Sequence, residues 1–352
     1  MTPPLDKGNA AEGVRATDKN TTRISPASRR TTMRELTYAA AVSEGLREEM
    51  EHDENVFLIG EDLGSVREAD DLFGEFRRHR VWQTPISESG FVGLAVGAAA
   101  AGLRPVVDIL YCDFVTVAMD QICNQAAKMH LMSGGSVKVP LVIKTPAGGG
   151  TREAAHHSQS LEAWFIHTPG LKVVMPSTPY DAKGLLKSSV RDDGPVVFVQ
   201  HRLLRRQTQE LPEGEWLVPL GEADVKREGE DITVVAISYA VTKALAAAEA
   251  LRDEISVEVV DPRSLVPLDA DAILRSVRKT GRLLVVHEAP ERGGVGAEIL
   301  RRVVTEGFAE LKAPPGVLGS ANVPMPYSPP LEDACIPQTR DIIHAVRERV
   351  SA

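Results

Sequence analysis

Short apolar runs alternate with polar segments along most of this chain, at the spacing of an α/β protein. Residues 90–101 are glycine, alanine, valine, leucine and phenylalanine without a charge, which predicts a buried helix that ends at Gly102. Apolar runs typical of short buried strands occur at residues 56–59, 106–110, 140–144, 172–175 and 196–199. Because helical stretches separate several of these strands, we predict a doubly wound parallel sheet.

A second α/β unit is predicted toward the C-terminus. Residues 201–216 interrupt the pattern with basic residues, glutamines, a proline and a glycine, and we interpret them as a linker between domains. Strands are expected beyond it at residues 232–237, 256–260 and 283–286, with a helix at 241–252. The predicted organisation is a larger domain at residues 32–200, the linker, and a smaller domain at 217–352.

The first 31 residues differ in composition from the rest. They are rich in threonine, arginine, asparagine, proline and serine, and we expect a disordered tail. Asp6, Glu12 and Asp18 spread negative charge through it, which is not typical of a transit peptide. Thr32, with Glu35 three positions later, predicts a capping box that starts a helix there.

Composition excludes several classes of function. The chain has 352 residues, which suits two domains, and its 40 Lys plus Arg against 49 Asp plus Glu give a net charge of −9. This charge argues against binding to a nucleic acid. The three widely spaced cysteines are expected to be reduced thiols, and no apolar run is long enough to span a bilayer. We therefore expect a soluble, cytoplasmic protein.

A single acid stands at the entrance of the predicted apolar helix. The run Thr-Pro-Ile-Ser-Glu-Ser-Gly-Phe at residues 84–91 places Glu88 there. Acids in the first turn of a helix commonly interact with its dipole, and that role alone accounts for Glu88. A carboxylate in so apolar a neighbourhood also needs a partner that shares its charge or proton, so Glu88 is a candidate for catalysis.

A glycine-rich segment leads to two histidines. Gly148, Gly149 and Gly150 precede the run Ala-Ala-His-His-Ser-Gln at residues 154–159. Glycines followed by a histidine are typical of an active-site loop, and an exposed loop with two incidental histidines explains the pattern equally well. Three glycines are also compatible with a phosphate cradle.

Several motifs occur together in an order and spacing that are specific to one family. They are Gly60-Glu61-Asp62 and the segments at residues 84–91, 120–135, 157–159, 169–179, 261–263 and 323–327. From about residue 33 to the C-terminus the chain resembles the beta subunits of the thiamine-diphosphate-dependent decarboxylating component of 2-oxo acid dehydrogenase complexes. The resemblance implies a transketolase-like fold, with a pyrimidine-binding domain at residues 32–200 and a transketolase C-terminal domain at 217–352.

The resemblance also implies roles for individual residues. Glu88 matches the glutamate that shares a proton with N1′ of the aminopyrimidine ring of thiamine diphosphate, which lets the exocyclic nitrogen remove the C2 proton. Ile86, Leu110 and Phe114 match residues that contact this ring. His157 matches a histidine that faces the cofactor and assists transfer of the acyl group to a lipoyl arm, whereas His156 has no counterpart.

Part of the cofactor site is expected on another polypeptide. Enzymes that hold the diphosphate through magnesium carry Gly-Asp-Gly followed by an asparagine, and no Gly-Asp-Gly occurs in this chain. The resemblance thus implies an alpha subunit that ligates magnesium, two copies of each subunit in a heterotetramer, and active sites shared between them. It further implies that the C-terminal domain docks the dihydrolipoyl acyltransferase core.

The family also holds a potassium ion, mostly through backbone oxygens. The matching positions are Leu141, Ser189, Val190, Asp192 and Gly194, where glycine replaces the asparagine of the family. Carbonyl ligation would survive that change. An ordinary turn between a helix and a strand explains the same residues.

The implied function is that of a 2-oxo acid dehydrogenase beta subunit, most simply for pyruvate, with an acetoin dehydrogenase beta subunit as the close alternative. The stretch at residues 63–82 is shorter than usual, and Arg205 stands where tyrosine is common, so the subunit contacts and the 2-oxo acid stay open. A split transketolase-type transferase would use the same glutamate but needs more basic residues for sugar phosphates. A non-catalytic scaffold is disfavoured because Glu88, Phe114 and His157 are all retained.

Overall fold

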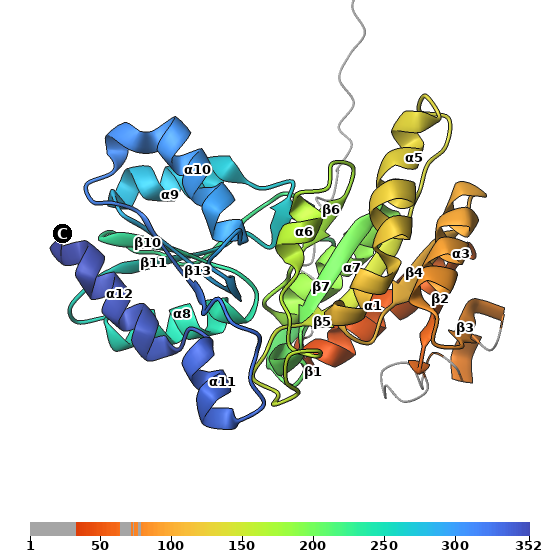
Figure 1. Ribbon diagram of the computed structural model, residues 1–352, viewed down its shortest axis with the longest axis horizontal. Helices are drawn as coiled ribbons and strands as arrows, with labels where there is room; N and C mark the ends of the chain where they lie inside the picture. Colours follow the sequence, from red (N-terminus) through yellow and green to blue (C-terminus); the bar gives the residue numbers. More distant parts are fainter. Residues whose placement is uncertain (1–32, 64–71, 73, 77–78) are drawn as a thin grey trace, which may run out of the picture. The chain divides into compact units, whose positions relative to one another are not determined.

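The computed structural model describes residues 33–63, 72, 74–76 and 79–352. Within these residues two mainly parallel sheets are each covered by helices on both faces, as Figure 1 shows. The predicted doubly wound parallel sheet and the second α/β unit are thereby confirmed. The tail predicted at residues 1–31, Thr32 and much of the shortened segment at 63–82 lie outside the described residues.

The first sheet has seven strands in the order β12-β6-β7-β5-β4-β2-β3. Every neighbouring pair is parallel except β12 and β6. Its strands are β2 (Val56–Glu61), β3 (Val81–Thr84), β4 (Arg104–Asp108), β5 (Val142–Ala147), β6 (Lys172–Val174), β7 (Val196–His201) and β12 (Ser264–Val266). Because β12 comes from the C-terminal half of the chain, that half completes the first sheet.

The second sheet has five strands in the order β14-β13-β10-β11-β9. Only β9 is antiparallel to its neighbour. The strands are β9 (Asp224–Arg227), β10 (Ile232–Ala236), β11 (Val257–Asp261), β13 (Leu283–Pro290) and β14 (Gly316–Ser320). The predicted strands at residues 232–237, 256–260 and 283–286 correspond to β10, β11 and β13.

Helices on both faces make each sheet doubly wound. Alternate side chains of the first sheet pack on α1 and α7 on one face and on α3, α6 and a π-helix on the other. The second sheet packs on α8 and α12 on one face and on α9 and α10 on the other. The helices are α1 (Tyr38–His52), α3 (Glu88–Ala100), α4 (Cys112–Val115), α5 (Ala127–Met132), α6 (Glu162–Ile166), α7 (Pro179–Arg191), α8 (Tyr239–Ala250), α9 (Ala270–Thr280), α10 (Val295–Gly307), α11 (Pro329–Cys335), α12 (Thr339–Ser351), the π-helix Asp120–Ala126 and the 3₁₀ turns Thr116–Ala118, Arg202–Leu204 and Phe308–Glu310.

One local prediction needs correction. The first helix begins at Tyr38, not near Thr32, because Thr37 caps it by accepting a hydrogen bond from the Ala40 amide at 3.1 Å. Residues before it form β1 (Met33–Thr37), which pairs antiparallel with β8 (Thr208–Pro212). The segment interpreted as a linker therefore contains a 3₁₀ turn and a paired strand.

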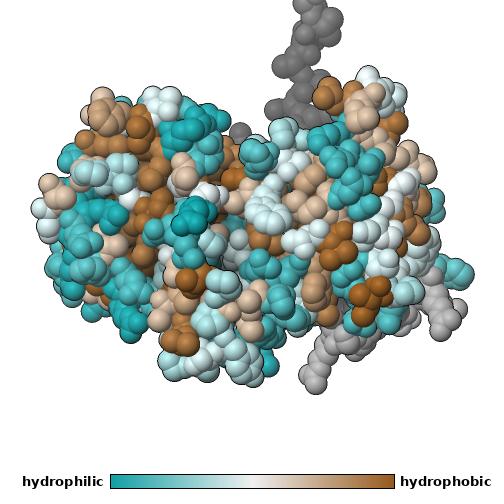
Figure 2. Space-filling model, viewed as in Figure 1, coloured by the Kyte–Doolittle hydropathy of each residue, from teal (hydrophilic) through white to brown (hydrophobic). Residues whose placement is uncertain are grey.

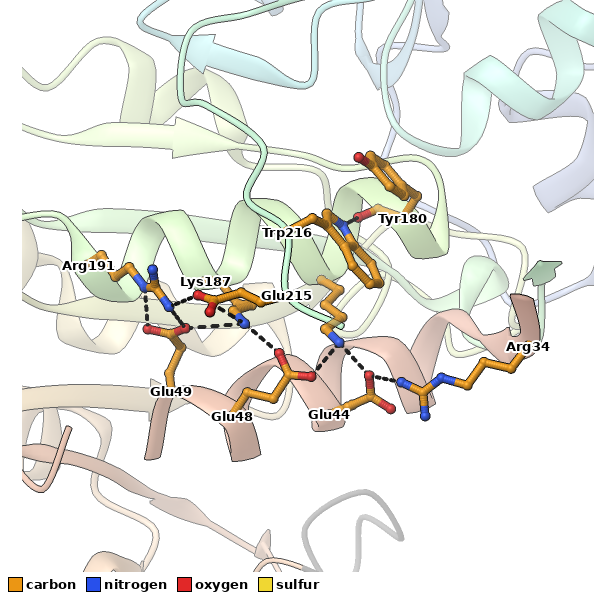
Figure 3. A network of polar contacts seen from close by, with 10 residues as sticks. Arg34, Glu44, Glu48, Glu49, Tyr180, Lys187, Arg191, Glu215 and Trp216 are labelled. Atoms are coloured by element: carbon orange, nitrogen blue, oxygen red, sulfur yellow. Dashed lines mark hydrogen bonds and ion pairs between the residues drawn. The ribbon is translucent and has the colours of Figure 1, made fainter. Parts of the chain in front are cut away.

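A buried network of charges joins α1 to α7 (Figure 3). Lys183 and Lys187 are almost completely buried. Lys183 contacts Glu44 and lies 2.5 Å from a carboxylate oxygen of Glu48, and its ammonium group is 4.3 Å from the centre of the Trp216 ring. Burial tends to raise the pKa of Glu44, but the hydrogen bond and charge of Lys183 bring it below its usual value.

Lys183→Ala is expected to lower the free energy of unfolding by about 3–5 kcal/mol, because it removes the fully buried cation that Glu44 and Glu48 share and leaves them, among the described residues, only Arg34 and Lys187 as partners. Urea unfolding of the purified chain measures this. Lys138→Ala is the control, since the Lys138 side chain is 62% exposed and its pair with Asp193 should contribute less than about 1 kcal/mol. Similar small losses in both variants would contradict a stabilising role for the network.

Candidate active site

Glu88 is the first residue of α3 and is 7% exposed. The N-cap residue Ser87 makes no side-chain capping bond, so its hydroxyl group does not satisfy the backbone amides of the first turn of α3. The predicted position of Glu88 at a buried helix entrance agrees with the structure. Its neighbour Ser89 donates a hydrogen bond to the Val117 carbonyl at 2.6 Å, which fixes the start of α3 beside the segment that follows Phe114.

A second carboxylate, Glu61, lies in the same region. It ends β2, is 4% exposed, and its Oε2 atom has no hydrogen-bond partner among the described residues. Burial, followed by the charges of Glu88, Asp62 and Asp108, raises the pKa of Glu61 to about 7. Glu61 thus exchanges a proton near neutral pH, and one of the charges responsible is Glu88. Asp108 is itself paired with Lys144 at 2.6 Å.

Three aromatic rings gather at the carboxyl end of β4. Tyr111, Phe114 on α4, and His157 from the glycine-rich loop stand edge-on to one another, with ring centres 4.3 Å (Tyr111 to His157), 5.5 Å (Phe114 to His157) and 5.6 Å (Tyr111 to Phe114) apart. Leu110 and Tyr111 also line a small cavity of about 120 Å³. The structure therefore brings Phe114 and His157 together beside Tyr111, the residue after Leu110, while His156 is exposed.

Ile86 is placed differently from the other apolar candidates. Its side chain is 72% exposed, two residues before Glu88. Leu94 on α3 and Val117, whose carbonyl accepts from Ser89, are 49% and 55% exposed. Hydrophobic residues also reach the surface between hydrophilic ones on the face shown in Figure 2. Exposed apolar side chains thus occur on the segment that carries Glu88 and on the segment bonded to Ser89.

The loop that carries His157 closes on itself. The Gly148 amide donates to the Gln159 carbonyl at 3.1 Å, and the Gln159 side chain donates to Asp113 on α4 at 2.8 Å. Gly148 has φ +87°, and a Cβ there would lie 2.2 Å from Nε2 of His201, so only glycine fits. The segment accordingly folds into an ordered loop.

The amides of this glycine run face carboxylates. The Gly149 amide donates to Glu288 at 3.0 Å and the Gly150 amide to Glu332 at 2.6 Å. The phosphate-cradle interpretation is therefore wrong, because two anionic groups already occupy the positions that a phosphate would need.

Two family models match most of the chain. Transketolase, pyrimidine binding domain, matches residues 34–207, and Transketolase, C-terminal domain, matches residues 221–342. The subunit beta of acetoin:2,6-dichlorophenolindophenol oxidoreductase from Cupriavidus necator is 43% identical over 90% of this chain and 97% of its own. The chain belongs to the family of 2-oxo acid and acetoin dehydrogenase beta subunits.

Other beta subunits of this family are equally similar. The pyruvate dehydrogenase E1 component subunit beta of Rickettsia bellii is 42% identical, and the 2-oxoisovalerate dehydrogenase subunit beta of Bacillus subtilis is 41% identical, each over 89% of this chain and 98% of its own. A solved structure, the inactive beta4 tetramer of a split gene transketolase, superimposes with a TM-score of 0.74 and 24% identity over 90% of this chain and 98% of its own. That likeness supports the fold.

Four of the residues predicted to hold potassium lie at the end of α7 and in the turn that follows it, and the fifth, Leu141, lies just before β5. Arg104 donates to the Val190 and Asp192 carbonyls, both at 3.0 Å, and the Gly194 amide donates to the Asp192 side chain at 2.7 Å. The Leu141 carbonyl accepts from the Val196 amide and the Ser189 carbonyl from the Asp192 amide. Because Arg104 already brings positive charge to two of these carbonyls, the geometry does not require an added cation, and the site stays a prediction.

Sequence patterns did not identify every residue that shapes this beta-subunit site. Glu61 belongs to the Gly60-Glu61-Asp62 motif, but the sequence alone predicted no role for it. Its position as an acid at the end of a buried strand could have identified it as a candidate. Glu288 and Glu332 gave no local signal, since they lie about 140 and 180 residues from the loop amides that they bind. Among residues 33–63 and 79–352, no three histidine, cysteine or acidic side chains are placed to hold a metal ion, and no helix is long and apolar enough to cross a membrane.

Proposed function

We propose that this chain is the beta subunit of a 2-oxo acid dehydrogenase, most simply for pyruvate, that works with an alpha subunit and thiamine diphosphate. When bound, this cofactor supplies the carbon nucleophile needed to decarboxylate a 2-oxo acid. The observation that carries the proposal is Glu88, a buried carboxylate at the start of α3 in a chain of this family. Glu88 would hold a proton at the ring nitrogen N1′.

The surrounding residues fit the ring side of this cofactor. Leu110 and Phe114 offer apolar surface, and the exposed Ile86 side chain is available to a ring that a partner helps to enclose. Glu61, whose Oε2 lacks a partner among the described residues, supplies a second group able to exchange a proton beside Glu88. His157, edge-on to Phe114, would donate or accept the proton when the acyl group passes to lipoamide.

The diphosphate and its magnesium ion would be held by the alpha subunit. The chain lacks Gly-Asp-Gly, and apolar side chains at Ile86, Leu94 and Val117 are exposed next to Glu88, as expected for a surface that a partner covers. We propose an assembly of two alpha and two beta subunits. Residues 32–200 would form the pyrimidine-binding domain, 201–216 the connection, and 217–352 the domain that docks the acyltransferase core.

The assay that tests the function uses the chain co-expressed with its alpha subunit. We expect acylation of lipoamide with release of carbon dioxide from pyruvate, and a kcat/KM for pyruvate about 10–200-fold above that for branched-chain 2-oxo acids, since each extra methylene changes binding by this order. Turnover of acetoin alone would identify an acetoin dehydrogenase, to which the 43% identical relative from Cupriavidus necator belongs. Transfer of a two-carbon unit between sugar phosphates, without lipoamide acylation, would refute the proposal.

A further inference from the structure

A fully buried acid in the C-terminal half of the chain, Glu332, helps to hold the loop that presents His157. Glu332 lies on α11 (Pro329–Cys335) and its side chain is 0% exposed. Its Oε1 atom accepts from the Gly150 amide at 2.6 Å, and its Oε2 atom accepts from the Arg152 amide at 3.2 Å and from the Arg152 guanidinium at 2.8 Å. A single carboxylate therefore satisfies three donors of the loop.

The backbone that Glu332 holds is strained. Arg152 and Ala154 have φ values of +63° and +62°, in the left-handed region that side chains with a Cβ disfavour. Such a conformation is energetically unfavourable for these residues and persists only where surrounding contacts determine it. For Arg152, the charge-assisted bonds to Glu332 are such contacts, because they fix the amides on either side of Thr151.

Glu288 and Arg202 also contact the loop, at its first residues. Glu288 accepts a hydrogen bond from the Gly149 amide. Burial tends to raise the pKa of Glu288, but the charge of His201 and its hydrogen bond hold this pKa below its usual value. Arg202 donates to the Gly148 carbonyl at 2.9 Å. These bonds fix the first residues of the loop. The bonds of Glu332 extend the hold to Arg152, Arg202 pairs with the next residue, Glu153, and Gln159 is bonded to Asp113 beyond His157.

His157 itself has few polar contacts to define its position. Its amide donates to the Ala154 carbonyl at 3.4 Å, and its ring rests edge-on against Tyr111 and Phe114. The backbone that leads to it consequently decides where the imidazole lies. We infer that Glu332 is a positioning residue for His157, so that α11 of the C-terminal domain sets the geometry of acyl transfer; this inference rests on the proposed function of His157.

The test compares Glu332→Ala and Glu332→Gln with Asp333→Asn in the co-expressed complex. Asp333 is a matched control, because it lies next to Glu332, contacts the same Arg152 guanidinium at 2.7 Å, and has a side chain that is 51% exposed. Hydrogen–deuterium exchange of residues 148–159 reports on the loop without any need for activity. Two rates are measured beside it, namely oxidation of the 2-oxo acid with 2,6-dichlorophenolindophenol and acylation of lipoamide.

In Glu332→Ala we expect the Gly150 and Arg152 amides to exchange at least about 10-fold faster, since they lose their acceptor. Lipoamide acylation should fall about 10–100-fold more than dye reduction, because displacing a catalytic group by an ångström has this effect. Glu332→Gln, which keeps one acceptor oxygen, should lie between, and Asp333→Asn should match the wild type. Unchanged exchange in Glu332→Ala, or equal losses of both rates, would overturn the inference.

His157→Asn separates this inference from the proposed function. It should lose acylation selectively while the loop amides keep their protection, because the contacts of Glu332 remain. Wild-type acylation in His157→Asn would refute the role of the histidine in the reaction. The exchange data would still decide whether Glu332 holds the loop.

Discussion

Glu88→Gln is expected to lower the rate of 2-oxo acid decarboxylation by the complex about 10²–10⁴-fold, the usual contribution of a positioned acid–base group. Glutamine retains a hydrogen bond to a ring nitrogen but cannot exchange the proton that the carboxyl group supplies. Folding and assembly should be preserved, because the side chains have nearly the same size and the site is at a helix start. Steady-state kinetics with the co-purified alpha subunit, together with gel filtration, measure both outcomes.

Glu298→Gln is the matched control for the simpler helix-dipole role of Glu88. Glu298 is also an acid in the first turn of a helix, α10, but its side chain is 42% exposed and pairs with Arg301. A dipole contribution is worth about 0.3–1 kcal/mol of stability at either position and nothing in catalysis. If Glu88→Gln decarboxylates at the wild-type rate, the chain is a scaffold and the proposed chemistry is wrong.

The sequence predicted the central strands because burial on both faces leaves a nearly continuous apolar signal. β2, β4, β5 and β7 lie at the predicted runs to within a few residues, and their neighbours are parallel as expected. Each run is short, bounded by turns and separated by helical segments. This local information is sufficient to specify a doubly wound sheet.

Pairings between distant segments could not be predicted in the same way. β1 is a strand because it pairs with β8 about 175 residues later, and the capping-box pattern of Thr32 and Glu35 had predicted a helix there. β12 has three residues, too few for a period-2 pattern, yet it extends the first sheet by pairing with β6. Tertiary contact determines these strands.

The residues of the candidate site also differ in whether the local sequence could predict them. Glu88 was predictable because a lone acid beside an apolar helix is a local contrast, and its burial agrees. Phe114 and His157, by comparison, came from resemblance, and the structure then placed their rings 5.5 Å apart. Glu332 could not be recognised from the sequence, because its hydrogen-bond donors, the Gly150 and Arg152 amides, belong to a distant segment in a different domain.

Binding of thiamine diphosphate is expected to require the alpha subunit. This chain offers groups for the ring side of the cofactor, namely Glu88, Leu110 and Phe114, but its sequence has no Gly-Asp-Gly for the diphosphate and magnesium. We expect affinity in the isolated chain to be at least about 10³-fold weaker than in the complex, which corresponds to about 4 kcal/mol.

Isothermal titration calorimetry with thiamine diphosphate and magnesium tests this central claim most directly, on the isolated chain and on the complex with its alpha subunit. The complex should bind the cofactor and decarboxylate the 2-oxo acid, and the isolated chain should show neither measurable binding nor turnover. Tight cofactor binding and unaided turnover by the isolated chain would contradict a site completed by a partner.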